Sequence, residues 1–221
     1  MKNLSLIIPA KNEADSLPKV LEELKNFELN IIVILEKSDF DTIESVKNFN
    51  CNLVYQSSKG YGNALIDGIN NVKTDYLCIF NADGSFDPKY LKDMLGKCED
   101  GLDFVFASRY LPNGGTDDDT IVTSFGNYMF SLIGKVFFSL KLTDILFTYL
   151  MGKTNSFKKL NLKSQDFGLC VEMPIKAKKF QMKYGELPSF ERKRIAGVKK
   201  VNEFIDGFKI LICMIKLFFK K

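Results

Sequence analysis

Residues 4–9 read LSLIIP, and this short apolar run begins the pattern that decides the fold. Such a run without charge is typical of a strand that is buried on both faces of a parallel sheet. Over residues 14–27 the apolar positions then recur at helical spacing. A buried strand that is followed directly by an amphipathic helix predicts an α/β fold.

The same alternation continues along the first half of the chain. Further strands are predicted at 29–35, 52–55, 76–80 and 104–107, and further helices at 41–49, at 63–71 and from Pro88. This order implies a mostly parallel sheet that is covered by helices on both faces. Ligands of such sheets bind beyond the carboxyl ends of the strands. The candidate loops are therefore 9–15, 36–41, 57–62 and 81–88.

The composition is that of a globular protein without histidine. The 221 residues are 46% hydrophobic and 26% charged, and the five cysteines include no C-x-x-C pair. A Ser-His-Asp triad, a Cys-His pair and a His-ligated zinc are therefore excluded, and neither a disulfide framework nor a zinc knuckle is indicated. Since only a few apolar residues precede KNEAD at 11–15, the start does not resemble a signal peptide. We expect a cytoplasmic protein with free thiols.

Charge is distributed unevenly along the chain. Residues 1–150 carry 14 Lys and Arg against 21 Asp and Glu, whereas residues 151–221 carry 17 against 6. This polarity predicts contacts with anionic groups, although a solvated lysine-rich surface is equally consistent with it. Nucleic acid is not expected as a partner, because the basic residues alternate with long aliphatic stretches rather than with small polar residues.

Residues 204–221, FIDGFKILICMIKLFFKK, predict an amphipathic C-terminal helix. Lys209 and Lys216 interrupt the apolar run, which is therefore too short to span a bilayer, for which about 20 residues are needed. A helix that lies in the membrane interface, with its lysines at headgroup level, fits the pattern better. Residues 125–150 have a similar apolar density. The alternative is that both segments are core helices or the seam of a homodimer.

Three loops at predicted strand ends carry the chemistry. Asn81-Ala82-Asp83-Gly84-Ser85 follows the strand at 76–80, and an aspartate on such a turn can hold a divalent cation that bridges a diphosphate. The first strand is followed by PAKNE at 9–13, and KGYGNA at 59–64 precedes a helix. In the last loop the glycines permit close backbone approach, and Lys59 beside a helix N-terminus favours an anion.

These segments resemble the family 2 glycosyltransferases of GT-A fold, and among them the polyprenol-phosphate sugar synthases of the dolichyl-phosphate mannose synthase type. The resemblance covers nearly the whole chain. It is carried, in order, by IIPAKNEADSL, KGYGNALIDGI, FNADGSFDP, ASRY followed by Gly114-Gly115, TDILFTY, QDFGLCVEMPIKA and ERKRIAGVKKVN.

The resemblance implies an α/β GT-A domain over residues 1–203, with a Rossmann-like, mostly parallel sheet; the residue pattern itself predicts the membrane-interfacial amphipathic helix over 204–221. It implies an inverting, metal-dependent hexosyltransferase that moves a sugar from a UDP- or GDP-linked donor to a polyprenyl phosphate, with Mg²⁺ or Mn²⁺ as cofactor. Because a phosphate monoester has a second pKa of about 6, such an acceptor needs no strong base. The expected location is the cytoplasm, peripherally on the inner face of the cell membrane.

The resemblance also assigns roles to individual residues. The nucleotide-sugar would contact Pro9, Ala10, Asn12, Glu13, Glu36, Lys59, Asn81, Ala82 and Asp83. The metal would lie on Asp83 and Ser85, with Asn81 in place of the first aspartate of an Asp-x-Asp motif. The expected catalytic residues are Asp83, Arg109 and Arg192, to which we add Asp166 as the carboxylate base to test. The acceptor phosphate is expected to contact Arg109, Arg194, Lys199 and Lys200.

Several alternatives stay open at the level of sequence. A soluble glycosyltransferase that acts on a hydroxyl of a capsule, lipopolysaccharide or glycoprotein glycan would need a carboxylate base, for which Asp166 is the candidate. A nucleotidyltransferase and a non-catalytic nucleotide-sugar-binding module are further alternatives. Asp144 and Glu172 are each either a site carboxylate or a satisfied buried acid, and Asp117-Asp118-Asp119 is interpreted as a solvated loop.

Overall fold

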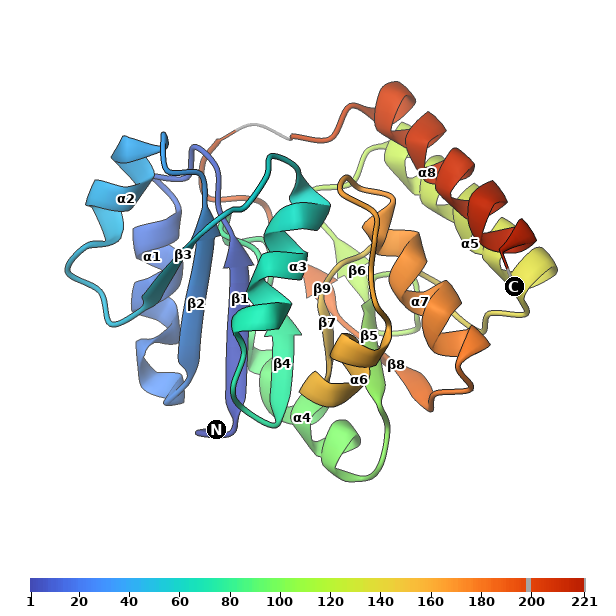
Figure 1. Ribbon diagram of the computed structural model, residues 1–221, viewed down its shortest axis with the longest axis horizontal. Helices are drawn as coiled ribbons and strands as arrows, with labels where there is room; N and C mark the ends of the chain where they lie inside the picture. The colour runs from blue at the N-terminus through green and yellow to red at the C-terminus, as the bar shows by residue number, and fades with distance from the viewer. Residues whose placement is uncertain (198–199, 221) are drawn as a thin grey trace.

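A computed structural model describes residues 1–197 and 200–220 and has a seven-stranded sheet of order β3-β2-β1-β4-β7-β5-β8 at its centre (Figure 1). These strands are β1 Leu4–Pro9, β2 Asn30–Leu35, β3 Asn52–Tyr55, β4 Tyr76–Ile79, β5 Phe104–Ser108, β7 Leu150–Lys153 and β8 Tyr184–Pro188. β7 runs antiparallel to both of its neighbours, and the other paired strands are parallel. A short second sheet pairs β6, Gly115–Thr116, with β9, Phe190–Glu191.

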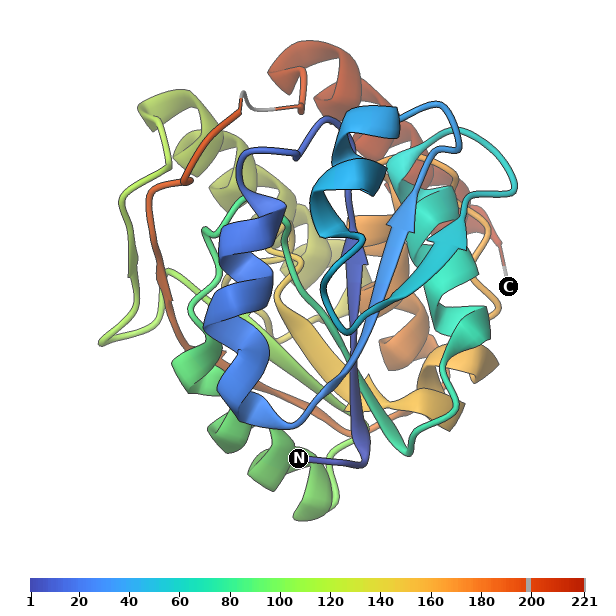
Figure 2. The same cartoon turned by 90° about the vertical axis from the view of Figure 1, so that its left-hand side faces the viewer.

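Helices cover both faces of the large sheet (Figure 2). They are α1 Leu17–Leu24, α2 Phe40–Val46, α3 Tyr61–Asn71, α4 Leu91–Glu99, α5 Ile121–Phe138, α6 Thr154–Lys159, α7 Leu169–Lys179 and α8 Glu203–Phe219. The side chains of α1, α2 and α4 pack in one hydrophobic cluster with the sheet, and those of α3, α6 and α7 pack in another on the opposite face. The predicted α/β class with a mostly parallel sheet is thus confirmed.

β1 shows why the strands are so apolar. Leu4, Leu6 and Ile8 pack in the cluster that contains α1, whereas Ile7 packs on the other face in the cluster of α3. All four side chains are fully buried. Burying each of them stabilises the fold by about 1.5–3 kcal/mol relative to exposure. The one polar residue of the strand, Ser5, is also buried, and its hydroxyl forms a hydrogen bond with Thr74 Oγ1 at 2.7 Å.

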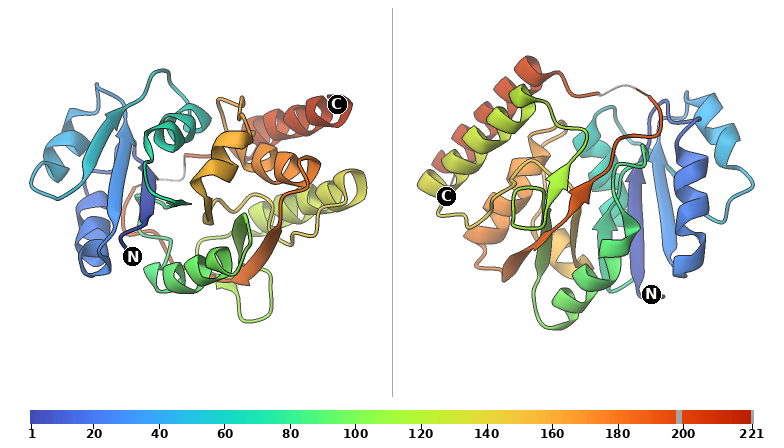
Figure 3. Two further views of the ribbon diagram at one scale, coloured as in Figure 1. Left: turned by 60° about the horizontal axis from the view of Figure 1, so that its bottom comes forward. Right: turned by 180° about the vertical axis from the view of Figure 1, so that it is seen from behind.

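α5 and α8 form an additional layer beyond α7, and they lie side by side in opposite views (Figures 1 and 3). Ile210, Met214 and Leu217 of α8 pack against Val171 and Ile175 of α7 in a third hydrophobic cluster. At the C-terminal ends of the two helices, the ring of Phe218 packs edge-on against Phe137 and Phe138. The predicted C-terminal helix therefore exists as α8, while its last residue, 221, lies outside the described residues.

The differences from the predicted elements have local causes. The helix predicted at 14–27 begins only at Leu17, because Pro18 occupies its first turn, and continues as a 3₁₀ turn over Lys25–Phe27. β7 and β8 were absent from the prediction. Each is only four or five residues long and contains a glycine, so neither has a run that stands out from a loop.

Glu172 of α7 is a satisfied buried acid. Its side chain accepts hydrogen bonds from the backbone N–H groups of Lys163 and Ser164, at 2.7–3.0 Å, and pairs with Lys176 Nζ at 2.6 Å. Burial alone would raise the pKa of this carboxyl, but these hydrogen bonds lower it below its ordinary value. The carboxylate thereby connects α7 to the loop that precedes it.

Glu172→Gln is expected to lower the free energy of unfolding by about 2 kcal/mol at neutral pH, because hydrogen bonds to a charged acceptor are lost. A lowered pKa contributes stability above the unfolded-state pKa of about 4.3 and loses it as the pH falls through the folded-state pKa. The difference between wild type and variant should therefore shrink between neutral and acidic pH. Urea unfolding followed by circular dichroism measures this, and an equal difference at both pH values would contradict it.

Candidate functional site

The carboxyl ends of β1, β2 and β4 border a cavity of about 1010 Å³. The loops after these strands form one side of it, and the segment between β9 and α8 and the first halves of α5 and α8 form the other. Its position agrees with the general rule for open α/β sheets. Most predicted site residues line it: Pro9, Ala10, Asn12, Glu13, Glu36, Asn81, Ala82, Asp83, Ser85, Arg109, Arg194 and Lys200.

The loop after β1 is fixed by α2. Asn12 has a left-handed backbone, with φ of 52°, and its N–H donates to Asp39 Oδ2 at 2.7 Å. The N–H of Glu13 donates to Thr42 Oγ1 at 3.0 Å. The Glu13 carboxylate in turn pairs with Lys200, which belongs to the segment between β9 and α8. Both walls of the cavity are therefore connected at this point.

Two polar side chains lie where β2 and β3 end in the cavity. Glu36 pairs with Lys11 Nζ at 2.8 Å, and its carboxylate can only accept hydrogen bonds from a ligand. Gln56, which the sequence analysis missed, lines the same region, and its buried Oε1 has no hydrogen-bond partner among the described residues. A buried unpaired oxygen is costly, which makes this atom a candidate acceptor for a hydrogen bond from a ligand.

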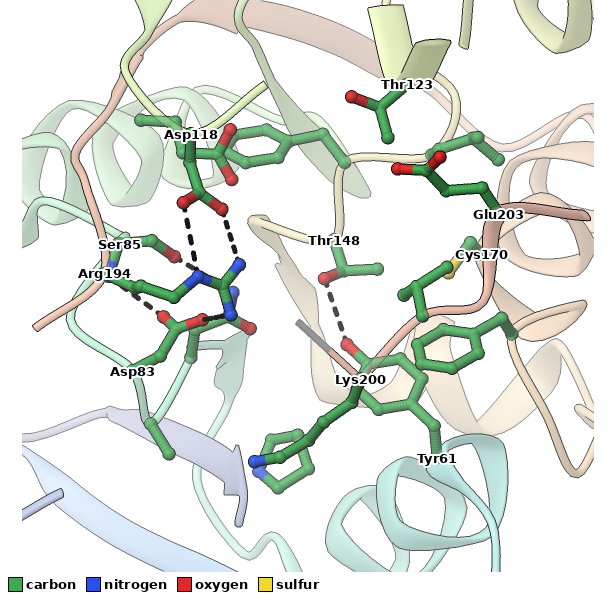
Figure 4. A pocket seen from close by; sticks show the side chains of 18 of the residues that line it. Tyr61, Asp83, Ser85, Asp118, Thr123, Thr148, Cys170, Arg194, Lys200 and Glu203 are labelled. Carbon is green, nitrogen blue, oxygen red and sulfur yellow. Dashed lines mark hydrogen bonds and ion pairs between the residues drawn. The ribbon is translucent and has the colours of Figure 1, made fainter. Parts of the chain in front are cut away.

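Asp83 lies on the turn that follows β4. Its Oδ1 accepts from the N–H of Ser85 at 3.0 Å, and its Oδ2 is 3.7 Å from Arg194 Nη1. The Arg194 guanidinium also forms a two-point contact with Asp118, at 3.2 and 2.5 Å, so that it lies between the two carboxylates (Figure 4). The acidic run around Asp118 is therefore not a solvated loop, contrary to the sequence interpretation.

The oxygen atoms near Asp83 fit a divalent cation with incomplete protein coordination. A carboxylate and the Ser85 hydroxyl are hard ligands of the kind that Mg²⁺ and Mn²⁺ prefer. Asn81 donates to Ser85 Oγ at 3.2 Å and so orients that hydroxyl. Within residues 1–197 and 200–220, no three Cys, Asp or Glu side chains form a metal-binding group. Phosphate oxygens of a ligand and water would have to complete the coordination.

Arg109 lines the cavity, but its guanidinium is occupied. Nε and Nη2 donate to Asp144 at 2.7 and 2.9 Å, and Nη1 donates to Glu191 at 2.9 Å and lies 3.6 Å from Asp119. Burial alone would lower the pKa of Arg109, but Asp144 and the other carboxylates raise it above its ordinary value. Arg109 is therefore a buried charged centre of the structure, and its role as a contact of the acceptor phosphate stays a prediction. Asp144 is its buried partner.

Arg192 and Asp166, both predicted as catalytic, are not among the described residues that line the cavity. Arg192 pairs with Glu23 of α1 through two nitrogens, at 2.7 and 2.9 Å, and also donates to the Phe86 carbonyl at 2.7 Å. The carboxylate of Asp166 accepts from the N–H of Gly168 at 2.9 Å, at the start of α7. Both side chains thus hold backbone segments in place. Lys199 lies outside the described residues.

The anion site predicted at the start of α3 is also corrected. The N–H groups of Gly62 and Asn63 already donate to the carbonyl of Gln165, at 3.0 and 3.3 Å. A Cβ on Gly62 would lie 2.2 Å from the carbonyl oxygen of Ser164, so this glycine permits the helix to approach that loop rather than a phosphate. Lys59 is exposed and is not among the described lining residues.

The end of the cavity away from β2 is apolar, and the sequence analysis did not predict it. This apolar end is lined by Val122, Phe125, Phe130, Leu146, Phe147, Phe167, Phe204 and Ile210. Tyr61 joins it: its ring stacks on Phe167 with a centroid distance of 4.8 Å, and its hydroxyl is 3.0 Å from Thr148 Oγ1. Burial raises the pKa of Tyr61, which keeps the phenol neutral. The cavity therefore joins a polar end to an apolar end.

Glu191 of β9 is a further lining residue that the sequence analysis missed. Burial raises the pKa of this carboxyl above its ordinary value, although Arg109 and Thr116 act in the opposite direction. Glu191 is thus a carboxylate of the cavity wall, whereas Asp166, the base expected from the sequence for a hydroxyl acceptor, is not among the described lining residues.

Comparison with known proteins identifies the architecture. Residues 5–161 match the family described as "Glycosyl transferase family 2". Glycosyltransferase AglJ of Haloferax volcanii is 25% identical over 190 residues, which cover 83% of this chain and 61% of AglJ; the chain thus spans less than two thirds of that relative. An uncharacterized protein of Methanocaldococcus jannaschii, MJ1222, is 25% identical over 218 residues, covering 95% of this chain and 90% of the relative.

Solved structures share the fold. Glucosyl-3-phosphoglycerate synthase from Mycobacterium tuberculosis, crystallised with Mn²⁺, UDP and phosphoglyceric acid, aligns with a TM-score of 0.76 at 12% identity, over 99% of this chain and 79% of the synthase. The structure of the same enzyme with Mg²⁺ and UDP aligns with a TM-score of 0.76 at 14% identity, over 97% of this chain and 78% of the synthase. At this identity the likeness concerns the fold alone, and it confirms the GT-A architecture expected from the sequence.

Because the guanidinium of Arg194 neutralises Asp83, Arg194→Ala is expected to tighten Mn²⁺ binding in the absence of nucleotide by roughly tenfold. Arg194→Lys keeps the positive charge and is the matched control, with an affinity close to that of the wild type. Electron paramagnetic resonance of free Mn²⁺ measures the affinity directly. Equal affinities for Arg194→Ala and the wild type would show that this arginine does not compete with a cation.

Proposed function

The chain belongs to glycosyl transferase family 2, and from this premise we propose that it transfers a sugar from a nucleoside diphosphate to the phosphate of a polyprenyl phosphate at a membrane surface. The observation that carries the proposal is the cavity with one polar and one apolar end. A donor with a charged diphosphate fits the strand ends around Asp83. A free glycan would leave the apolar end in contact with water, whereas a polyprenyl phosphate brings an apolar chain to it.

The donor is assigned to the polar end. Glu36 and Gln56 are placed to meet its base, and Asp83 with Ser85 to hold a cation beside its diphosphate. The synthase structures that contain UDP together with Mn²⁺ or Mg²⁺ support the use of a divalent ion. Such an ion would neutralise the negative charge that develops on the leaving diphosphate. Arg194 and Lys200 add two positive side chains on the opposite wall.

Transfer then needs little proton chemistry from the protein. An acceptor phosphate oxygen attacks the anomeric carbon from the face opposite the diphosphate, the bond to the diphosphate breaks, and the configuration inverts. With a second pKa of about 6, the phosphate is already ionised at neutral pH. The protein's contribution is to orient the two substrates and to exclude water, which agrees with a chain that contains no histidine.

One observation favours the second candidate, transfer to a glycan hydroxyl. A hydroxyl must lose a proton during attack, and Glu191 lies on the cavity wall with a raised pKa. However, Glu191 Oε2 already accepts from Arg109 and from Thr116 Oγ1 at 2.8 Å. The carboxylate therefore has an evident structural role, and the polyprenyl phosphate is the acceptor that also explains the apolar end.

The outer surface of the same two helices supports the proposed membrane location. The α5–α8 face consists of exposed Ile121, Val122, Phe125, Tyr128, Met129, Leu132, Val136 and Phe137 of α5 and Phe204, Ile205, Phe208, Ile215, Phe218 and Phe219 of α8. An apolar patch of this extent marks an interaction site. Together with the basic C-terminal part of the chain, it supports peripheral binding to the anionic inner face of the cell membrane.

α5 is by length and composition able to cross a membrane, the one such helix among the described residues, and only 11% of that window is buried. Its attachment to the domain favours an interfacial position. Asn127 Oδ1 accepts from the N–H of Leu146 at 3.1 Å, and a Cβ on Gly134 would lie 3.0 Å from Ile145. A helix fixed to the body in this way would lie along the bilayer surface with its apolar face inserted.

Radiolabelled UDP- and GDP-linked sugars, offered singly with Mn²⁺ and undecaprenyl phosphate, are expected to yield butanol-extractable label with one donor. The rate should rise as the acceptor phosphate loses its second proton, at a pKa of about 6, and level off above it. Asp83→Asn should lower the rate by roughly a hundredfold. Label in a water-soluble glycan, with none in the lipid under any donor, would refute the lipid acceptor.

The chain has no tryptophan, so a single introduced indole reports on its own surroundings. Phe208→Trp lies on the α5–α8 face, at a side chain that is 66% exposed, and its emission is expected to shift to the blue when anionic vesicles are added. Phe40→Trp, at a 73% exposed position on α2, is the matched control and should not shift. Equal responses of the two variants would argue against a specific membrane face.

A further inference from the structure

We propose that Asn127 of α5 binds the acceptor's phosphate and that the isoprenoid chain leaves the cavity between α5 and α8, beside Gly126 and Gly207. The inference rests on the proposed function, since it specifies where the polyprenyl phosphate lies. At the apolar end of the cavity, for which the sequence suggested no binding residue, it assigns Asn127 to the phosphate and the gap between α5 and α8 to the isoprenoid chain.

Asn127 is a buried polar group with an unused donor. Its residue is 2% exposed, it lines the cavity, and its Nδ2 has no hydrogen-bond partner among the described residues. The bond from the N–H of Leu146 to Asn127 Oδ1 fixes the orientation of the amide. A buried donor without a partner is destabilising, so its retention in an apolar wall indicates an acceptor atom supplied by a ligand. A phosphate oxygen is such an atom.

The cavity reaches the surface at the first turns of the two helices. Phe204, Phe125 and Val122 line it, yet they are 83%, 64% and 53% exposed. Towards their C-terminal ends the helices are closed against each other by the Phe218 contacts. The opening therefore lies within the α5–α8 face, at the level where the proposed membrane surface would meet the protein. An apolar chain can pass there without crossing water.

Two glycines widen this opening. Gly126 and Gly207 lie inside α5 and α8 and line the cavity, and a Cβ on either would meet no described atom within 4 Å. By contrast, Gly68 and Gly134 are needed for packing, since a Cβ on them would lie 2.9 and 3.0 Å from a neighbouring isoleucine. Glycine weakens a helix relative to alanine. Packing does not require glycine at 126 or 207, so both positions leave free space in the cavity wall where a ligand chain can lie.

The basic residues around the cavity agree with this placement of the phosphate. Arg194 and Lys200 line the same cavity on the segment that leads into α8. Their partners, Asp118 and Glu13, also belong to the cavity wall. An anionic headgroup is thus received between an amide donor and two cations, while its chain points toward the apolar opening.

The test uses Phe125→Trp as a fluorescent reporter of binding and three probes: undecaprenyl phosphate, undecaprenol, which lacks the phosphate, and the short citronellyl phosphate. Asn127→Asp replaces the donor by a negative oxygen of equal size. This substitution should weaken the binding of undecaprenyl phosphate and citronellyl phosphate by about tenfold or more and leave the binding of undecaprenol unchanged. Gly126→Leu and Gly207→Leu should weaken the two long-chain probes by about tenfold and citronellyl phosphate much less.

Gly96→Leu is the matched control, because Gly96 of α4 also has no described atom within 4 Å of a Cβ but does not line the cavity. It should leave all three affinities unchanged. Three results would each overturn the proposal. In the first, Asn127→Asp weakens undecaprenol binding as much as phosphate binding; in the second, the leucine variants affect long-chain and short-chain probes equally. In the third, the reporter protein binds none of the probes. Binding of the lipid phosphate without sugar transfer would instead remove the proposed function and leave this subsite standing.

Discussion

The buried guanidinium of Arg109 connects the elements that form the wall of the cavity opposite the strand ends. These elements give the cavity its apolar end in addition to the polar end at the sheet. The guanidinium joins the end of β5 to Asp144, which precedes β7, to Asp119, which precedes α5, and to Glu191 of β9. Its plane also lies over the ring of Phe147, 4.5 Å from the centroid, in the apolar wall. Removing one partner of a buried ion pair typically costs about 3–5 kcal/mol, because the remaining charges are left without compensation. The position of α5, and with it the far wall of the cavity, depends on this centre.

The same arrangement explains why the basic residues of the site divide into two kinds. Arg109 and Arg192 donate through several nitrogens at once, Arg109 to Asp144 and Glu191, and Arg192 to Glu23 and the carbonyl of Phe86. Arg194 and Lys200 contact carboxylates that themselves border the cavity, namely Asp83, Asp118 and Glu13. Arg194 and Lys200 are also more exposed than Arg109, at 21% and 36% against 9% of the side chain, so an exchange of an internal partner for a ligand costs less desolvation there. Charge on the cavity wall is thus balanced before any ligand binds, which limits the repulsion between neighbouring carboxylates.

Sequence reasoning succeeded where the signal is local. The apolar run of β1 and the loop that carries Asp83 each follow from a few adjacent residues, and their meeting at one sheet edge follows from the parallel topology. It failed where the partner is distant along the chain. Arg109 and Glu191 are 82 residues apart, and Arg192 and Glu23 are 169 apart, so nothing near either arginine marks it as structural. Asn127, an asparagine within an apolar helix, could be recognised only once its unused donor and the cavity were visible together.

The antiparallel insertion of β7 has a consequence for how the chain acquires this structure. β5 pairs only with β7 and β8 among the described strands, and both follow it in sequence, β7 beginning 42 residues after β5 ends. While the chain emerges from the ribosome, β1 to β4 can assemble in order, but the fully buried strand Phe104–Ser108 has no native partner strand yet, because β7 separates it from β4. Its apolar side chains and unpaired backbone N–H and C=O groups stay exposed until Leu150–Lys153 is synthesised, and such segments promote aggregation of nascent proteins. The pairing of β5 with β7 and β8 is therefore a late step of folding, because it requires contacts between residues that are far apart in the sequence.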